Sequence, residues 1–94
     1  MYSLGLIYKK GEEGFEKNIE KAIDLFNKAI EVGNSSAMNS LALIYQYGDD
    51  GVKKDLEKAR ILFQKAIDLG NNNASENLKS LKKDNDSFLG QVLY

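Results

Sequence analysis

The sequence predicts an all-α protein, a solenoid of stacked α/α hairpins, and two observations lead to this fold class. First, the chain repeats itself, because "LFNKAIEVGN" at residues 25–34 returns as "LFQKAIDLGN" at residues 62–71 with seven of ten residues identical. The match extends in both directions with a step of 37 residues. Second, apolar residues inside each repeat follow the 3.6-residue period of an amphipathic helix. Repeats of this length are typical of solenoids, in which each unit buries its apolar face by stacking on a neighbour.

Each repeat is predicted to contain a helix, a loop and a second helix. In the first helix of the complete repeat, the apolar residues fall at i, i+4, i+7 and i+8, which places them on one face. They are Ala37, Leu41, Ile44 and Tyr45. The second helix carries a similar stripe made of Leu56, Ala59, Leu62, Phe63, Ala66, Ile67 and Leu69. These two faces are the predicted core.

The helix ends are also marked in the sequence. Asn18 and Asp55 each precede an apolar helical stretch, where their side chains can cap the first backbone amides. Gly33 and Gly70 follow such stretches, where a helix commonly ends in a left-handed residue that glycine adopts without steric cost. The spacing therefore divides one domain, residues 1–94, into a partial unit 1 (residues 1–34), a full unit 2 (residues 35–71), a partial unit (residues 72–83) and a tail (residues 84–94).

The tail does not continue the repeat. Phe88, Leu89, Val92 and Leu93 fall at i, i+1, i+4 and i+5, which predicts a short helix that folds back over the last hairpin as a cap. The alternative is an apolar segment that contacts a partner.

Sixteen positions of this pattern carry a family resemblance. They are Ala37, Leu41, Ala42, Tyr45, Gly48, Gly51, Val52, Asp55, Lys58, Ala59, Phe63, Lys65, Ala66, Gly70, Asn71 and Ala74. The pattern resembles the Sel1-like repeat, a relative of the tetratricopeptide repeat, and departs from it at Ala42, where the family often has glycine, and at Leu25 and Leu62, where it often has tryptophan. The resemblance implies hairpins stacked in a right-handed superhelix that serves as a scaffold or adaptor for protein complexes.

The composition favours interaction over catalysis. Thirteen basic residues against fourteen acidic ones give a net charge of −1, so no overall field attracts nucleic acid or an anionic membrane. The chain has no histidine and no cysteine, which removes the commonest general base and most zinc ligands. We therefore expect a non-enzymatic module that needs no cofactor or metal and binds a protein or peptide.

One alternative is a β-lactamase-like hydrolase or an enzyme accessory, as described for cysteine-rich relatives of this repeat family. The stretch "SLKK", Ser80 to Lys83, has the Ser-x-x-Lys spacing of penicillin-recognising enzymes, but the sequence lacks their Ser-Asp-Asn and Lys-Thr-Gly elements. We interpret it as a chance match on a polar helix face.

Two other sets of polar residues receive a structural interpretation. The acidic pairs of "GEEGF" and "GDDGV" are interpreted as turns because they lack the spacing of a calcium loop. Three sequons occur, at Asn34, Asn73 and Asn85, and the start of the chain does not resemble a secretory leader. We expect a cytoplasmic protein without glycans, and a secreted fragment is the alternative.

The predicted binding surface is the face of the first helices that the core stripe leaves open, because first helices line the concave face of tetratricopeptide-like stacks. Its residues are Tyr2, Leu6, Lys9, Lys10, Asn39, Leu43, Gln46, Tyr47, Asn73, Glu76, Ser80 and Lys83. Tyrosine, asparagine and lysine suit contact with a peptide. Leu43 and Tyr47 have an alternative role in packing between helices.

The beginning of the chain is the last feature of the sequence. Met1 aligns with Met38, so the first helix starts one residue after the alanine that opens the repeat pattern. Leu4 and Ile7 would then lack the cover of a preceding helix. We expect either a fragment of a longer repeat array or a weak homodimer formed through the first hairpin.

Overall fold

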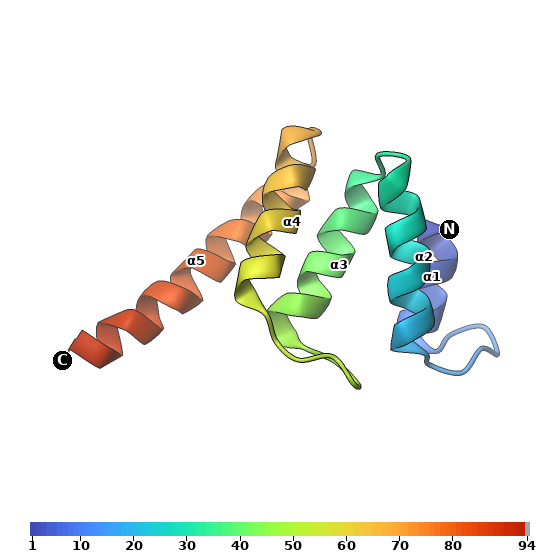
Figure 1. The fold of residues 1–94 in the computed structure, drawn as a ribbon, viewed down its shortest axis with the longest axis horizontal. Helices are drawn as coiled ribbons and strands as arrows, with labels where there is room; N and C mark the ends of the chain where they lie inside the picture. Colours follow the sequence, from blue (N-terminus) through green and yellow to red (C-terminus); the bar gives the residue numbers. More distant parts are fainter. Residues whose placement is uncertain (94) are drawn as a thin grey trace.

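In the computed structural model, the backbone is described for residues 1–93 and the side chains for residues 1–82. This part of the chain forms five α-helices, which are α1 (Tyr2–Lys10), α2 (Ile19–Glu31), α3 (Ser35–Tyr47), α4 (Leu56–Asp68) and α5 (Asn72–Leu93). The predicted all-α class is confirmed. Figure 1 shows the helices arrayed in chain order along the longest axis of a molecule with extents of 48 × 28 × 17 Å.

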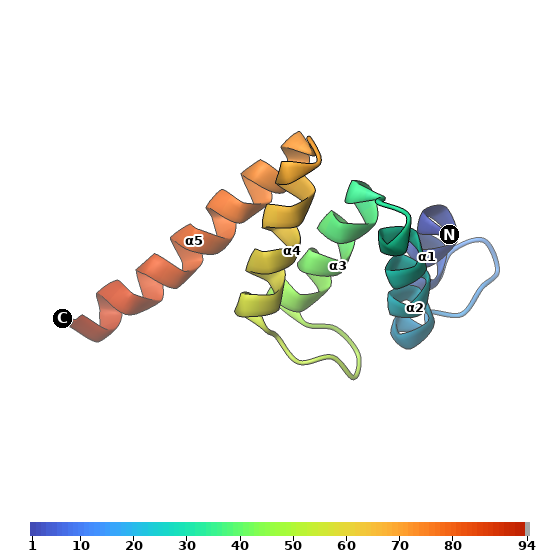
Figure 2. The ribbon, with the colours of Figure 1, turned by 45° about the horizontal axis from the view of Figure 1, so that its top comes forward.

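The helices form two successive hairpins followed by α5. α1 packs on α2, α3 packs on α4, and α2 and α3 form the contact between the hairpins. α5 packs on α4 and also contacts α3, so that it begins a third layer (Figures 1 and 2). The described helices therefore form the predicted helical repeat fold. The right-handed superhelix stays a prediction.

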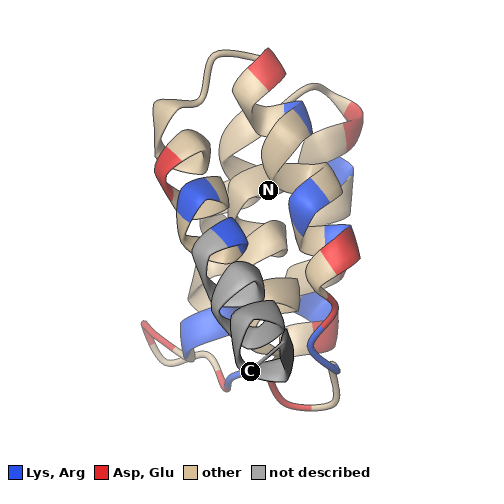
Figure 3. Cartoon of the chain, turned by 90° about the vertical axis from the view of Figure 1, so that its left-hand side faces the viewer, with Lys and Arg blue, Asp and Glu red and all other residues tan. Residues whose placement is uncertain are grey.

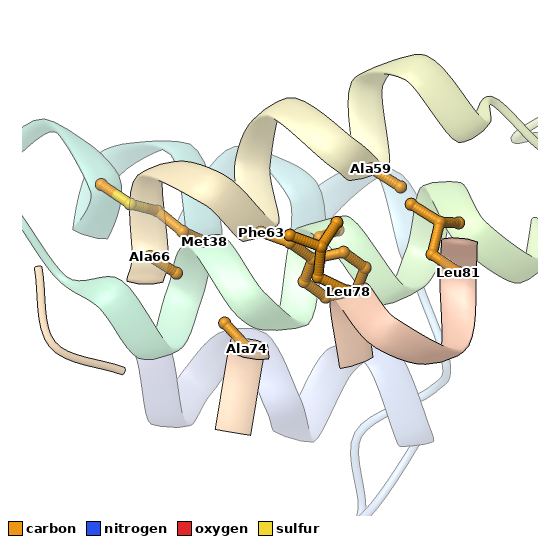
Figure 4. Close-up of a cluster of buried hydrophobic side chains, with 8 residues drawn as sticks. Met38, Ala59, Phe63, Ala66, Ala74, Leu78 and Leu81 are labelled. Carbon is orange, nitrogen blue, oxygen red and sulfur yellow. The ribbon is translucent and has the colours of Figure 1, made fainter. Parts of the chain in front are cut away.

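Two apolar clusters form the core. The first cluster joins unit 2 to α5 and contains Met38, Ala42, Ala59, Phe63, Ala66, Ala74, Leu78 and Leu81 (Figure 4). The second cluster joins units 1 and 2 and contains Ala22, Phe26, Ala29, Ala37, Leu41 and Ile44. In both clusters small alanines let the helices approach closely, and one fully buried phenylalanine fills the space between layers.

The predicted core stripe is largely confirmed. Ala59, Phe63 and Ala66 of α4 are buried, while Leu56, Leu62 and Ile67 are half-buried against the clusters. Leu69 was predicted to share this face, and that prediction is wrong because its side chain is 56% exposed. Leu69 lies just after the last residue of α4, so it no longer follows the helical period that keeps the stripe on one face.

The predicted helix ends are confirmed. The side chains of Asn18 and Asp55 accept backbone hydrogen bonds from the residues three positions later, at 3.0 and 3.1 Å. Gly33 and Gly70 have φ angles of 83° and 90°, in the left-handed region that glycine favours.

The asparagine after each of these glycines has two roles at the helix ends, which the sequence did not lead us to expect. Asn34 donates its backbone N–H to Ala29 at 3.1 Å and accepts the N–H of Ala37 on its side chain at 2.9 Å. Asn71 makes the equivalent pair of bonds at 3.0 and 3.1 Å. One asparagine thus closes a helix and caps the next, which fixes the angle between successive hairpins.

α5 is a single helix from Asn72 to Leu93. The predicted cap formed by the apolar residues of the tail, 84–94, lies outside the described side chains.

Candidate functional site

The predicted binding surface divides into three groups of side chains. Tyr47, Asn73, Glu76 and Ser80 are exposed, with Tyr47 at 67%. Tyr2, Leu6, Lys9, Asn39 and Leu43 are half-buried, whereas Lys10 is exposed. The side chain of Lys83 lies outside the described residues. Apart from Lys10 at the end of α1, the exposed members come from α3 and α5, two first helices that contact each other.

Gln46 was predicted to face a partner, and its predicted exposure is wrong because only 2% of the residue is accessible. Neither its amide oxygen nor its amide nitrogen has a hydrogen-bond partner among the described residues. The reason for its burial lies in the position of α3, which is covered by α2, α4 and α5. These covering helices lie elsewhere in the chain, so the residues next to Gln46 in the sequence do not indicate that it is buried.

Three apolar members of the predicted surface contribute to the core instead. Tyr2 and Leu6 pack against the second cluster, and the Tyr2 ring lies 6.0 Å from the Phe26 ring. Leu43 packs against the first cluster, which was the alternative role considered for it. The part of the surface that remains accessible is therefore smaller and more polar than predicted.

Polar side chains also join neighbouring first helices, which the sequence interpretation missed. Asn77 of α5 donates its side-chain amide to the side-chain oxygen of Asn39 of α3, at 2.9 Å. Where α3 and α5 begin, the side-chain amide of Asn71 donates to the hydroxyl of Ser35 at 3.4 Å. Both bonds are partly buried, and they hold α3 and α5 in a fixed relative position beneath the exposed residues.

The interhelix loops are joined by an ion pair. The Lys17 ammonium lies 2.9 Å from a carboxylate oxygen of Asp49 and 3.4 Å from one of Asp50. The hydrogen bond from Lys17 lowers the pKa of Asp49 below the usual range for an aspartate. The acidic pair in this loop was interpreted as part of a turn, and the structure adds a link from unit 1 to unit 2.

The described residues contain no group of histidine, cysteine, aspartate or glutamate side chains that is suited to hold a metal ion. Ser80 of the Ser-x-x-Lys stretch is exposed on α5 and does not line the crevice of about 160 Å³ between α4 and α5, although the next residue, Leu81, does. A crevice of about 290 Å³ lies between α2 and the loop that contains Asp50.

Two further observations concern the surface. None of the described helices combines the length and apolar character needed to cross a membrane. Among the sequon residues, Asn73 is exposed, whereas the side chain of Asn34 is half-buried and bonded to the backbone of α3, and Asn85 lies outside the described side chains.

Comparison with known proteins places this fold in a family. The Sel1 repeat model matches residues 1–34 and 35–71. Among solved structures, the chain is similar to c5321, a protective antigen of uropathogenic Escherichia coli that displays an SLR fold, with a TM-score of 0.80 and 32% identity. The match covers 85% of this chain and 17% of that one, so the chain spans a small part of the larger protein. No curated protein sequence matches significantly. Repeats of this kind are generally non-catalytic interaction modules, and the two matched units show that the chain belongs to the Sel1 repeat family.

Proposed function

We propose that this chain is a non-enzymatic scaffold or adaptor module that binds a peptide or a partner protein on the face of its first helices. The observation that carries the proposal is Tyr47, a large aromatic side chain that is 67% exposed at the end of α3. A rigid aromatic of this kind offers contact area at a small cost in side-chain entropy.

The neighbouring first helix supports this assignment. α5, which contacts α3, presents Asn73, Glu76 and Ser80, all exposed, which are able to satisfy the polar groups of an extended peptide. Glu76 lies 3.9 Å from Lys79, and both side chains are more than 70% exposed. Such an exposed ion pair is weak, so breaking it costs little when Glu76 contacts a partner. The Asn39–Asn77 bond keeps the two helices in register beneath this surface.

The position of the binding surface is tested by site-specific crosslinking. A photoreactive phenylalanine analogue is placed at Tyr47 in one variant and at Ile61 in a control variant, because Ile61 is 41% exposed on α4, a second helix. Each purified full chain is irradiated in a cell extract, and adducts are identified by mass spectrometry. We expect a specific adduct from position 47 and none from position 61.

The energetic role of Tyr47 is then tested with the identified partner. Tyr47→Ala should weaken binding by about tenfold, as expected for an exposed aromatic anchor, while Ile61→Ala leaves the affinity unchanged. Circular dichroism confirms that both variants are folded. Equal adducts from both positions, or unchanged binding by Tyr47→Ala, would place the partner elsewhere.

The same preparation separates the module from an enzyme. Nitrocefin hydrolysis by the wild-type chain above that of a Ser80→Ala variant would overturn the non-enzymatic assignment.

A further inference from the structure

The crevice between α2 and the loop after α3, here called the α2 crevice, has an apolar floor and an acidic rim. Its volume is about 290 Å³, and it is lined by Glu20, Ile23, Asp24, Asp50, Gly51 and Val52. Ile23 and Val52 are half-buried and pack against the second cluster, so the core holds the floor in place. The three acidic side chains are exposed. The loop extends toward the start of α2, which brings the two walls together (Figures 1 and 2).

The carboxylates that α2 contributes to the rim are not neutralised within the chain. Glu20 and Asp24 are one helical turn apart, and neither forms an ion pair with any residue among those with described side chains. The two neighbouring lysines have other contacts. Lys17 pairs with the loop aspartates at 2.9 and 3.4 Å, and the Lys21 ammonium lies 5.0 Å from the centre of the Tyr8 ring. The rim therefore keeps a negative charge that a cation from outside the chain can meet.

The equivalent place in unit 2 shows which cation suits such a carboxylate. Glu57 lies 37 residues after Glu20, and Arg60 occupies the position of Ile23. The Arg60 guanidinium pairs with Glu57 through Nε and Nη2, one nitrogen to each carboxylate oxygen. Both residues line the smaller crevice of about 160 Å³. Unit 2 thus carries its own arginine at this place, whereas unit 1 has the carboxylates without one.

The geometry of the α2 crevice favours a guanidinium over other cations. The acidic side chains of the described residues form no group that could hold a metal ion, so a larger cation is needed to reach both walls. A guanidinium is planar, offers five N–H donors and binds carboxylates through two of them at once, whereas an ammonium is a compact point charge. The aliphatic stem of an arginine can pack on apolar side chains such as Ile23 and Val52. The crevice is also smaller than most pockets for drug-sized molecules, which begin at about 300 Å³, and suits a single side chain.

We propose that the α2 crevice binds an arginine side chain of a partner protein. The guanidinium lies between the carboxylates of Glu20 and Asp24 on one wall and that of Asp50 on the other, and its stem packs on Ile23 and Val52. None of the lining residues belongs to the binding surface proposed for the first helices. The α2 crevice is therefore a second contact site, which can be tested without the partner that binds at Tyr47.

The test is an NMR titration of the isotope-labelled full chain with three small probes. These are the N-acetyl amides of arginine, lysine and citrulline, of which citrulline keeps the shape of arginine without its charge. We expect the arginine probe to shift the amide signals of residues 20–24 and 50–52 with millimolar affinity, which is usual for a single side chain. The lysine probe should bind at least about threefold more weakly, and the citrulline probe should cause no shift.

Matched variants separate the α2 crevice from general attraction to negative charge. Glu20→Gln combined with Asp24→Asn removes two charges from the crevice. Glu12→Gln combined with Glu13→Gln removes two charges from another loop, and all four side chains are exposed. The first double variant should weaken binding of the arginine probe by at least about tenfold, and the second should leave it unchanged. The amide spectra show whether both variants are folded.

A further variant tests the comparison with unit 2. Ile23→Arg places an arginine in unit 1 at the position of Arg60. This internal guanidinium should occupy the α2 crevice, so the arginine probe should no longer shift the signals of residues 20–24 and 50–52. Urea unfolding checks that the variant is folded, because Ile23 is half-buried.

Three results would overturn the proposal. An arginine probe that leaves residues 20–24 and 50–52 unshifted would show that the α2 crevice binds no guanidinium. Equal affinities for the arginine and lysine probes would show that the crevice does not select arginine. An equal loss of binding in the two double variants would show that the probe is attracted by the overall negative charge of the surface.

Discussion

Units 1 and 2 share their local structure but differ in what surrounds them. In both units the N-cap residue of the second helix donates its backbone N–H to the tyrosine carbonyl of the first, from Asn18 to Tyr8 at 2.8 Å and from Asp55 to Tyr45 at 2.7 Å. A lysine ammonium also lies over each of these tyrosine rings, at 5.0 and 5.2 Å. Yet α1 has nine residues with one buried, whereas α3 has thirteen with seven buried.

The difference shows that the sequence of one unit determines its hairpin, while burial depends on the units beside it. α3 contacts helices on both sides, and α1 contacts α2 with one face. A stack of repeats gains much of its stability from such interfaces between neighbours. Figure 3 marks the lysine, arginine, aspartate and glutamate positions of the described residues on the ribbon, and none of them belongs to the two buried clusters, which consist of apolar residues.

The largest expected effect concerns the two core phenylalanines. Phe63→Ala and Phe26→Ala each remove a fully buried ring, and each should lower the free energy of unfolding by about 3 to 5 kcal/mol. The two variants should differ in how much of the chain unfolds. Phe63 lies in the cluster that joins unit 2 to α5, so its loss should destabilise the whole stack, whereas loss of Phe26 should release α1 and α2 first.

Hydrogen exchange measures this contrast after the stability of both variants has been determined by urea unfolding. Phe26→Ala should lose protection in residues 1–31 and keep it in residues 35–68. If both variants lose protection uniformly, the two units form one cooperative block and the comparison between them fails.

The next effect concerns how closely α1 approaches α2. An added Cβ at Gly5 would lie 2.7 Å from Cε1 of Phe26, whereas unit 2 has Ala42 at the equivalent position. Gly5→Val should therefore lower the free energy of unfolding by about 2 to 3 kcal/mol through overpacking. In a Phe26→Leu background the penalty should shrink, which a double-mutant cycle with urea unfolding measures. An equal penalty in both backgrounds would show that contact with Phe26 is not its cause.

The sequence predicts the parts of the fold that depend on a few neighbouring residues. The capping of Asn18 and the left-handed glycines at Gly33 and Gly70 follow from interactions within one turn of helix, and the structure confirms them. The apolar period also predicts Phe63 and Ala66 correctly as core residues, because a helix carries its period along its whole length.

The candidate site is less accessible to sequence reasoning because it depends on contacts between units. Gln46 aligns with Lys9 of unit 1, and its polar side chain gives no sign that it is buried on a helix that contacts three others. Lys17 and Asp49 lie 32 positions apart in two separate loops, so no local pattern indicates their ion pair. A signal was present for Asn34 and Asn71, since an asparagine before a helical stretch is a common N-cap.

A smaller effect compares the glycines that follow the second helices of units 1 and 2. Gly33 and Gly70 have positive φ, and an added Cβ would meet no heavy atom within 4 Å at either position. The cost of valine is thus a backbone cost, on the order of 1 to 2 kcal/mol at each site. Thermal unfolding should give similar losses for Gly33→Val and Gly70→Val, and a smaller loss for asparagine. A clear inequality would show that tertiary contacts distinguish the two helix ends.

The smallest effect concerns the pH dependence of the ion pair that joins the loops of units 1 and 2. The pKa of Asp49 is lowered in the folded protein by its bond to Lys17, so the folded state binds the Asp49 proton less readily than the unfolded state. The stabilisation is therefore present above the unfolded pKa, at about pH 4, and is lost as the pH falls through the lower folded value. Asp49→Asn should be less stable than wild type at pH 6, and the difference should disappear in more acidic solution.

Urea unfolding of the two proteins between pH 6 and pH 2 measures this difference. Asp50→Asn is the matched control, because Asp50 is 81% exposed and lies farther from the ammonium, at 3.4 Å, so its effect should be smaller. Molar salt should reduce the difference at pH 6, since both loops are accessible to solvent and such pairs are screened. A difference between wild type and Asp49→Asn that persists unchanged at pH 2 would mean that the aspartate stabilises the loop as a hydrogen-bonding group. In that case the link between unit 1 and unit 2 would be carried by the apolar cluster alone.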